Sequence, residues 1–314
     1  DFFVGGMNPE MLDACQSAGI YAIPAEYNLP VMSPESVYTK NTSSEVLEQL
    51  NTHPAAVGEY LADQVHTEHF TDLRELLDLY REKRPNSMPF LTVPALYMRH
   101  LEERCGAKTY QEYLDRFLDE IPSHYLCAEL FPYDLEREGL YSDYLENLDI
   151  LSNTARAHNK ELWLLVQAGS FSLFTKPLED QLLWQAYVSL AYGTTGFFHV
   201  SATPFMWQET TTLYDWEGKQ NTTFQRVAKA NKILRDLSPI YTQYTNVGVT
   251  GIYDNITITY KDQINAQKER NAARGLTDEI LLPFTEWSTD EAVLAGVFQA
   301  KETADLPNST AVLL

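Results

Sequence analysis

Short apolar runs alternate with amphipathic helical patterns along the first 240 residues, and this alternation limits the fold more than any other feature of the chain. The clearest unit begins at residue 55, where mostly apolar residues lead to the polar pair Asp63-Gln64 and a helical pattern starts near Thr67. Apolar strands that alternate with amphipathic helices indicate a parallel sheet covered by helices. The seven expected strands lie at 2–4, 20–25, 55–62, 89–96, 125–128, 162–166 and 196–200.

Eight such units close into a barrel, typically of about 250 residues. Seven units are visible before Tyr241, and the chain opens directly on the apolar run Phe2-Phe3-Val4. We therefore predict an α/β fold of the (β/α)8 TIM-barrel class, with the first strand upstream of residue 1. The rival is an open doubly wound sheet, but no Gly-rich phosphate loop follows any of the expected strands.

The pattern changes after Tyr241. Residues 247–253, 256–260 and 293–298 are rich in β-branched and aromatic side chains, whereas 261–278 is polar and indicates a loop or a frayed helix. We therefore predict two domains, a barrel over residues 1–241 and a partial all-β accessory domain over residues 242–314.

The charge balance excludes several classes of partner. The chain carries 44 acidic and 23 basic residues, which gives a net charge of −21. Such a surface repels the phosphates of nucleic acids and of anionic membranes, and it is compatible with a neutral ligand. No apolar run reaches the roughly 18 residues of a membrane span. The three cysteines lie far apart without a CxxC pattern, so we predict buried thiols and no zinc site.

Polar and aromatic side chains gather where the expected strands end, and barrels of this class place their reactive groups at the carboxyl ends of the strands. Three carboxylates qualify, namely Glu26, Asp63 and Glu129. Aromatic rings in strand-end loops suit the C–H faces of sugars, and neighbouring amide or imidazole groups can bond to hydroxyls. The candidate binding residues are Glu26, Asn28, Tyr97, Tyr133, Gln167, His199 and Trp207, with Tyr27, Phe131, Phe205 and Trp216 as further rings.

Each candidate also has a simpler structural interpretation. Asp63 could cap a helix over Thr67–Leu73, and Glu26 and Glu129 could anchor the loops that follow their strands. The two histidines of His66-Thr-Glu-His69 could be metal ligands, but their spacing matches neither HExxH nor the inverse motif, and no third ligand is evident. We therefore predict no metal and no cofactor, and a metal-dependent hydrolase is the least favoured hypothesis.

Five motifs stand in a recognisable order along the chain. They are His53-Pro54 to Asp63-Gln64 (similar to HPAVVGY…DEP), Glu129 to Pro132 (Y-D-x-Y-P), Trp163 to Gln167 (F-W-x-x-Q), Trp184 to Gly193 (Q-x-Y…LAYG) and Asp215 to Gly218 (D-x-x-G). Each motif alone is short, but the ordered set resembles glycoside-hydrolase-like barrels of the broad clan that includes β-galactosidases and agarases. The resemblance covers roughly residues 1–240.

This resemblance implies a glycoside hydrolase that acts on an oligo- or polysaccharide in the extracellular space or the periplasm. In that clan the general acid/base is a Glu at the end of strand four. Counting Phe2-Phe3-Val4 as strand two makes this position 64, which holds Gln and cannot exchange a proton. Either Gln64 is an inactivating Glu-to-Gln substitution, or the chain is a non-catalytic glycan-binding barrel, or Asp63 performs the acid/base step.

Cleavage of a glycosidic bond needs two carboxyl groups that flank it, and their separation decides whether the configuration is retained or inverted. The clan's nucleophile is a Glu at the end of strand seven, where this chain has Gln167, so position alone identifies no nucleophile. We predict Gln64 as the acid/base position and Glu129 as the second carboxyl group, with Glu26 as the next choice. The sequence leaves the sugar, the linkage and the oligomeric state open.

Overall fold

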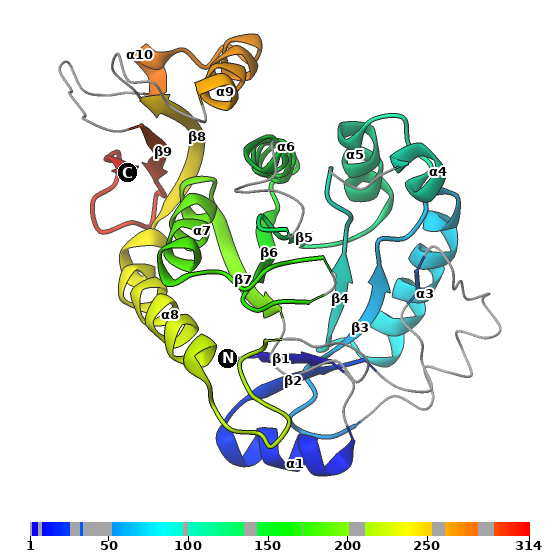
Figure 1. Cartoon of the computed structure of the whole chain (residues 1–314). Coiled ribbons are helices and arrows are strands. Elements are labelled where there is room, and N and C mark those ends of the chain that lie inside the picture. Colours follow the sequence, from blue (N-terminus) through cyan, green and yellow to red (C-terminus); the bar gives the residue numbers. More distant parts are fainter. Residues whose placement is uncertain are drawn as a thin grey trace. The chain divides into compact units, whose positions relative to one another are not determined.

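The computed structural model describes residues 2–5, 8–25, 32–33, 52–96, 100–134, 143–171, 173–200, 211–252, 261–281 and 292–314 (Figure 1). They belong to two compact units, Asp1–Ala128 (unit 1) and Glu129–Leu314 (unit 2), each of which is treated as a separate body. The domain boundary at residue 241 and the strand upstream of residue 1 stay predictions.

Unit 1 is built on parallel strands. They are β1 (Phe2–Gly5), β2 (Tyr21–Pro24), β3 (Gly58–Asp63) and β4 (Met88–Thr92). β1 pairs with β2 and β3 pairs with β4, and a parallel bridge between Ala22 and Ala56 joins β2 to the segment that leads into β3. The strands therefore stand in chain order, as in a barrel, without the order reversal of a doubly wound sheet.

Helices follow these strands, as the alternation predicts. They are α1 (Pro9–Ala18), the 3-10 helix η1 (Thr67–His69), α3 (Phe70–Lys83), α4 (Leu101–Cys105) and α5 (Tyr110–Glu120). The Asn8 side chain accepts a hydrogen bond from the Met11 amide at 2.8 Å and caps α1, which ends at Gly19 with φ 68°. The residues that α3 buries against the unit are Phe70, Leu73, Leu76, Leu77 and Tyr80.

Unit 2 continues the alternation. Its strands are β5 (Tyr125–Leu130, which begins in unit 1), β6 (Glu161–Gln167) and β7 (Thr194–Val200), and its first helices are α6 (Tyr144–Ala157), α7 (Glu179–Ala191) and α8 (Thr222–Tyr241). The sheet order is β5-β6-β7, β6 pairs with β7 in parallel, and α7 and α8 lie side by side (Figure 1). The described strands form no closed barrel, so what is confirmed is the mixed α/β architecture with parallel strands in chain order.

The C-terminal part of unit 2 combines a sheet with helices. β8 (Tyr244–Ile252), β9 (Val293–Ala300) and β10 (Thr310–Leu313) form an antiparallel sheet, and α9 (Lys261–Ala273) and α10 (Asp278–Leu281) come between β8 and β9 in the chain. Residues 261–278, which the sequence analysis leaves open between a loop and a frayed helix, thus contain the helix α9, and the C-terminal part combines strands with helices. The choice is open in the sequence because α9 lacks the apolar stripe by which a helix is recognised.

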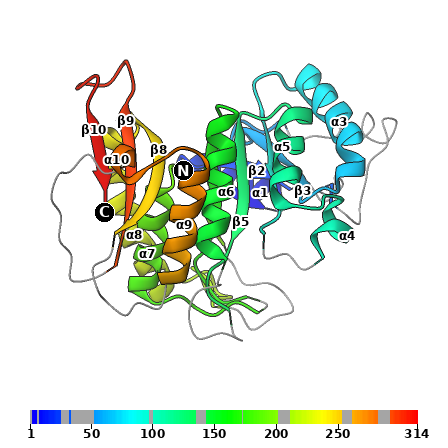
Figure 2. The same cartoon turned by 90° about the horizontal axis from the view of Figure 1, so that it is seen from above.

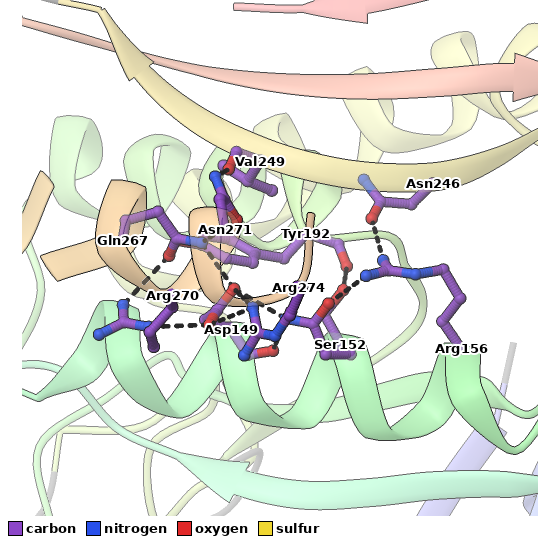
Figure 3. A network of polar contacts seen from close by, with 11 residues as sticks. Asp149, Ser152, Arg156, Tyr192, Asn246, Val249, Gln267, Arg270, Asn271 and Arg274 are labelled. Carbon is purple, nitrogen blue, oxygen red and sulfur yellow. Dashed lines mark hydrogen bonds and ion pairs between the residues drawn. The ribbon is translucent and has the colours of Figure 1, made fainter. Parts of the chain in front are cut away.

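Polar side chains attach α9 to α6, and the two helices lie side by side (Figure 2). Asp149 of α6 is 2% exposed, and its carboxylate accepts hydrogen bonds from Arg270 Nε at 2.8 Å and Arg274 Nη1 at 2.9 Å (Figure 3). A third donor, Gln267 Nε2, lies 2.6 Å from the same carboxylate. Residues 267 and 270 share one face of α9 because they are three apart, and Arg274 in the turn that directly follows reaches the same carboxylate.

The same face of α9 also reaches β8 and the end of α7. Asn271 Nδ2 donates to the Val249 carbonyl at 2.7 Å, and the Tyr192 hydroxyl donates to Gln267 Oε1 at 2.9 Å. Burial raises the pKa of Tyr192 well above its usual value, so its hydroxyl remains a donor. A buried polar network therefore connects this helix to its neighbours, beside the buried side chain of Ile264. No helix in the described part of the chain is long and apolar enough to cross a membrane.

Candidate functional site

The carboxyl end of β3 carries the first two candidate residues. Asp63 ends the strand, and Gln64 follows at φ 51°, in the left-handed region where residues other than glycine are uncommon. The Gln64 amide donates to the Thr92 carbonyl, at the end of β4, at 2.9 Å and so holds the chain in this turn. An unusual backbone conformation that its surroundings maintain is typical of functional sites.

A β-bulge in β3 brings two side chains to one partner. The register between β3 and β4 shifts between Tyr60 and Ala62. Without this shift, residues 60 and 63 would point to opposite faces of the sheet, because side chains alternate along a strand. With it, the Tyr60 hydroxyl lies 3.0 Å from Thr92 Oγ1, and Asp63 Oδ1 lies 2.6 Å from the same oxygen.

The direction of this hydrogen-bond chain follows from its final acceptor. The Thr92 hydroxyl donates its only proton to the Asp63 carboxylate, so the Tyr60 hydroxyl donates to Thr92 in turn. Asp63 is thus held as an acceptor, which suits a positioning or charge-stabilising role better than the donation of a proton. The sequence analysis missed Tyr60 and Thr92. Thr92 could have been found as a polar residue at the end of a strand. The bulge that brings Tyr60 to it has no signal in the local sequence.

Buried tyrosines of α5 fix the loops that leave β3 and β4. The Tyr113 hydroxyl donates to the Val65 carbonyl at 2.8 Å, and the Tyr110 hydroxyl donates to the Pro94 carbonyl at 2.6 Å. Burial raises the pKa of Tyr113 well above its usual value, so this donor keeps its proton at neutral pH. These bonds hold the backbone around Gln64 in place before any ligand binds, as a preorganised site requires.

A helix-capping role for Asp63 finds no support in the hydrogen bonds around η1. His66 precedes η1, and its Nδ1 accepts a hydrogen bond from the Glu68 amide at 3.2 Å. Glu68 Oε1 lies 3.3 Å from His66 Nδ1 and 3.4 Å from His69 Nε2. No group of three or more His, Cys, Asp or Glu side chains in the described residues is arranged to hold a metal ion.

In unit 2, Gln167 ends β6 and is 0% exposed. Its Nε2 donates to the carbonyls of Tyr133 at 2.9 Å and Thr175 at 2.6 Å, and its Oε1 accepts from the Tyr133 amide at 3.0 Å. The amide of Gln185, from α7, pairs with the Gln167 backbone through two bonds of 3.0 Å. In this arrangement Gln167 and Gln185 join the loops after β5 and β6 to α7, which gives two of the recognised motifs a structural role.

Replacement of Gln167 by Glu should destabilise the protein by about 2–4 kcal/mol, because a carboxylate would face two carbonyl oxygens without a proton to donate. Urea denaturation measures this change. The matched control is Gln181→Glu. Gln181 Oε1 accepts from the Leu178 amide at 2.8 Å, a role that a carboxylate also fills, so a change within about 0.5 kcal/mol is expected. Equal stability of Gln167→Glu and the natural chain would contradict the structural assignment.

The other candidates of unit 2 are distributed as follows. Glu129 lies within β5 rather than after it and is partly buried. Tyr133 is 5% exposed, and its hydroxyl donates to the Gln181 carbonyl at 3.1 Å. His199 of β7 has its Nε2 2.7 Å from Asn231 Oδ1, and burial lowers its pKa, which keeps the ring neutral at neutral pH. The convergence of Glu129 with Gln64, which belongs to unit 1, stays a prediction.

Aromatic rings do gather at the strand ends of unit 2. Phe131, Phe171 and Phe174 pack together with centroids 5.0–5.2 Å apart. Trp216 is 66% exposed in a turn where Asp215 Oδ1 accepts from the amides of Glu217 at 2.9 Å and Lys219 at 2.8 Å. The predicted residues that lie outside the described part of the chain are Glu26, Tyr27, Asn28, Tyr97, Phe205 and Trp207.

No family model and no curated protein matches the sequence. A catalytic mutant of Gan42B, a GH42 β-galactosidase from G. stearothermophilus, matches the structure with a TM-score of 0.53 at 10% identity, over 74% of this chain and 49% of that chain. A Bacteroides thetaiotaomicron protein assigned as an α-L-fucosidase matches with a TM-score of 0.50 at 11% identity, over 72% of this chain and 71% of that chain. The fold is glycoside-hydrolase-like.

These two likenesses establish the fold and nothing finer, because identities of 10% and 11% carry no residue roles from one chain to another. A β-glucuronidase from Ruminococcus gnavus matches with a TM-score of 0.49 at 11% identity, over 74% of this chain and 43% of that chain. The chain thus spans about half the length of the galactosidase and less of the glucuronidase. The glycoside-hydrolase-like fold that the motif order implied is confirmed at this level.

Proposed function

We propose that the chain is a glycoside hydrolase of the β-galactosidase and agarase type, whose acid/base position is residue 64 and holds glutamine. The observation that carries the proposal is the setting of Gln64. It follows the bulged strand β3 in a left-handed turn, beside a carboxylate that Thr92 and Tyr60 orient. Such barrels place their reacting groups at this edge of the sheet.

Glutamine has nearly the shape of glutamate but no acidic proton. A Glu at position 64 would stand next to the Asp63 carboxylate, and a neighbouring negative charge favours the protonated form that a general acid needs. Asp63 itself accepts from Thr92 at 2.6 Å, so we assign it the role of a positioning and charge-stabilising group. Glu129 is our choice for the second carboxyl group, and its distance from position 64 would decide between retention and inversion.

With glutamine at position 64, the chain is expected to hold a neutral or weakly charged oligosaccharide outside the cytoplasm and to cleave it slowly. The second candidate function is a non-catalytic glycan-binding barrel. It is favoured by one observation, that amides stand at both positions 64 and 167, where the clan carries acids. Both functions require sugar binding at the end of β3, and they differ only in turnover.

The first test is calorimetric titration with neutral β-galactosides and β-glucosides. Saturable binding is expected, and Asp63→Ala should weaken it at least about tenfold, because a hydrogen bond that involves a charged group is worth about 1.5–3 kcal/mol. The control Asp78→Ala removes a carboxylate from the exposed face of α3 and should leave binding unchanged. If no neutral glycan binds, or if Asp63→Ala binds as tightly as the natural chain, the site is not at this strand end.

A further inference from the structure

The loop after β6 runs along the first turns of α8 in unit 2. Lys176 Nζ lies 3.3 Å from Thr222 Oγ1, and Arg226 Nη1 donates to the Pro177 carbonyl at 3.3 Å. Residues 222 and 226 are four apart and therefore share one face of α8. The two contacts place the Lys176 ammonium and the Arg226 guanidinium next to each other on this face, and these two groups form the Lys176–Arg226 pair.

No described carboxylate neutralises this pair. The next cation on the same face, Lys229, forms an ion pair with Glu179, the first residue of α7. The first turn of α8 carries no acidic residue, and in the described residues neither Lys176 nor Arg226 forms an ion pair. Burial and the neighbouring Arg226 lower the pKa of Lys176, as expected for two like charges held together.

This arrangement is unusual for a chain with 44 acidic and 23 basic residues. Other cations of the same region have acidic partners, since Lys219 pairs with Glu217 at 2.6 Å and Lys232 pairs with Asp236 at 2.5 Å. Two adjacent cations without a counter-charge repel each other, and an anion that binds between them relieves this repulsion. Arg and Lys are also the side chains that bind carboxylate and sulfate groups through charge-assisted hydrogen bonds.

The pair lies where a ligand of this fold is expected. Lys176 and Pro177 belong to the loop that leaves the carboxyl end of β6, and α8 follows the loop that leaves β7. The two loops are joined, because the Ser170 amide donates to the Thr211 carbonyl at 2.8 Å. Barrels of this class bind their substrates with these strand-end loops.

We propose that Lys176 and Arg226 bind an anionic group of a sugar, either the carboxylate of a uronic acid or a sulfate ester. The sugar part of this inference rests on the proposed function, whereas the anion part does not. The net charge of −21 does not prevent it, because charges farther away than about 8 Å are largely screened at physiological ionic strength. The pair therefore acts on an anion at contact range.

The test compares methyl β-D-glucuronide and galactose 6-sulfate with the neutral methyl β-D-glucoside and with free inorganic sulfate, by calorimetric titration. We expect the two anionic sugars to bind at least about tenfold more tightly than the neutral sugar, and more weakly as salt rises. Lys176→Ala and Arg226→Ala should each abolish this preference. The control Lys229→Ala, which removes a paired cation from the same helix face, should retain it.

A charge-reversal variant separates binding from folding. Lys176→Glu supplies Arg226 with a carboxylate, so the melting temperature should stay the same or rise while the preference for anionic sugars disappears. Equal binding of charged and neutral sugars, or an unchanged preference in Lys176→Ala, would overturn the proposal. Binding of free sulfate as tight as that of the sugar anions would refute its sugar part. Anion binding in a chain that binds no neutral glycan would refute the proposed function but not the anion site.

Discussion

Replacement of Gln64 by Glu is expected to raise the hydrolysis of a glycoside with a poor leaving group by about 10²–10⁴-fold, the usual contribution of a general acid. The substitution adds an acidic proton with almost no change in volume. The backbone N–H of Gln64 donates a hydrogen bond to the Thr92 carbonyl at 2.9 Å, and this bond, which holds the turn, is unchanged by the substitution. The new carboxyl group would stand beside Asp63, whose negative charge favours its protonated form.

The choice of substrate makes this prediction specific to acid catalysis. The dinitrophenolate of a dinitrophenyl glycoside leaves without being protonated. Gln64→Glu should therefore accelerate the cleavage of this substrate far less than that of an alkyl glycoside or an oligosaccharide. The ratio of the two effects on kcat/KM reports the protonation of the leaving oxygen, and a general gain in folding or binding would not change it. The rate for the alkyl glycoside should also fall at high pH, as the new carboxyl group loses its proton.

Two variants serve as controls for Gln64→Glu. Gln16→Glu makes the same chemical change on the exposed face of α1 and should leave all rates unchanged. Gln64→Ala should remain as slow as the natural chain. If Gln64→Glu binds neutral glycans but cleaves no substrate faster, position 64 is not the acid/base position, and the glycan-binding barrel becomes the better hypothesis.

Asp149→Ala is expected to destabilise unit 2 by about 3–5 kcal/mol, the usual cost of removing one partner from a buried ion pair. The Asp149 side chain is 3% exposed, and the change leaves Arg270 and Arg274, at 21% and 30% exposure, without their shared acceptor. Gln267 Nε2 loses its 2.6 Å bond as well. Urea denaturation measures the loss, and hydrogen exchange should locate it in α9 and β8.

The matched control for this prediction is Asp236→Ala. Asp236 also pairs with a cation, Lys232, but both side chains are exposed, at 64% and 71%. An exposed pair four residues apart on a helix contributes only about 0.3–0.5 kcal/mol, so this variant should unfold almost like the natural chain. Similar stabilities for Asp149→Ala and Asp236→Ala would mean that the network of Figure 3 does not hold α9 in place.

Sequence patterns located the elements of the α/β part because each depends on neighbours in the chain. The run that ends at Asp63-Gln64 becomes β3, and the pattern that starts near Thr67 becomes η1 and α3. The same patterns left residues 261–278 open between a loop and a frayed helix, because polar groups of Gln267, Arg270, Asn271 and the adjoining Arg274 supply much of the docking of α9. A helix that binds by polar groups has no apolar periodicity for a sequence analysis to detect.

The candidate site shows the same division. Asp63 and Gln64 were identified from their place at a strand end, but Thr92 and Tyr60 entered the site through a register shift between two strands 30 residues apart. Gln167 was a candidate for sugar binding. In the structure its side-chain amide instead forms hydrogen bonds with the backbone of Tyr133 and Thr175. The partners of a side chain depend on long-range packing, which single-chain patterns do not encode.

The sequence by itself determined the alternation of strands and helices, the places where strands end and the excess of negative charge, because these follow from residue type and short-range order. Only the tertiary structure decided which strand-end groups meet. It joined Tyr60 and Thr92 to Asp63, gave Asp149 its arginines and left Lys176 beside Arg226 without a counter-charge in the described residues. These contacts join segments that are distant in the chain, and their geometry arises only when the sheet and its helices pack.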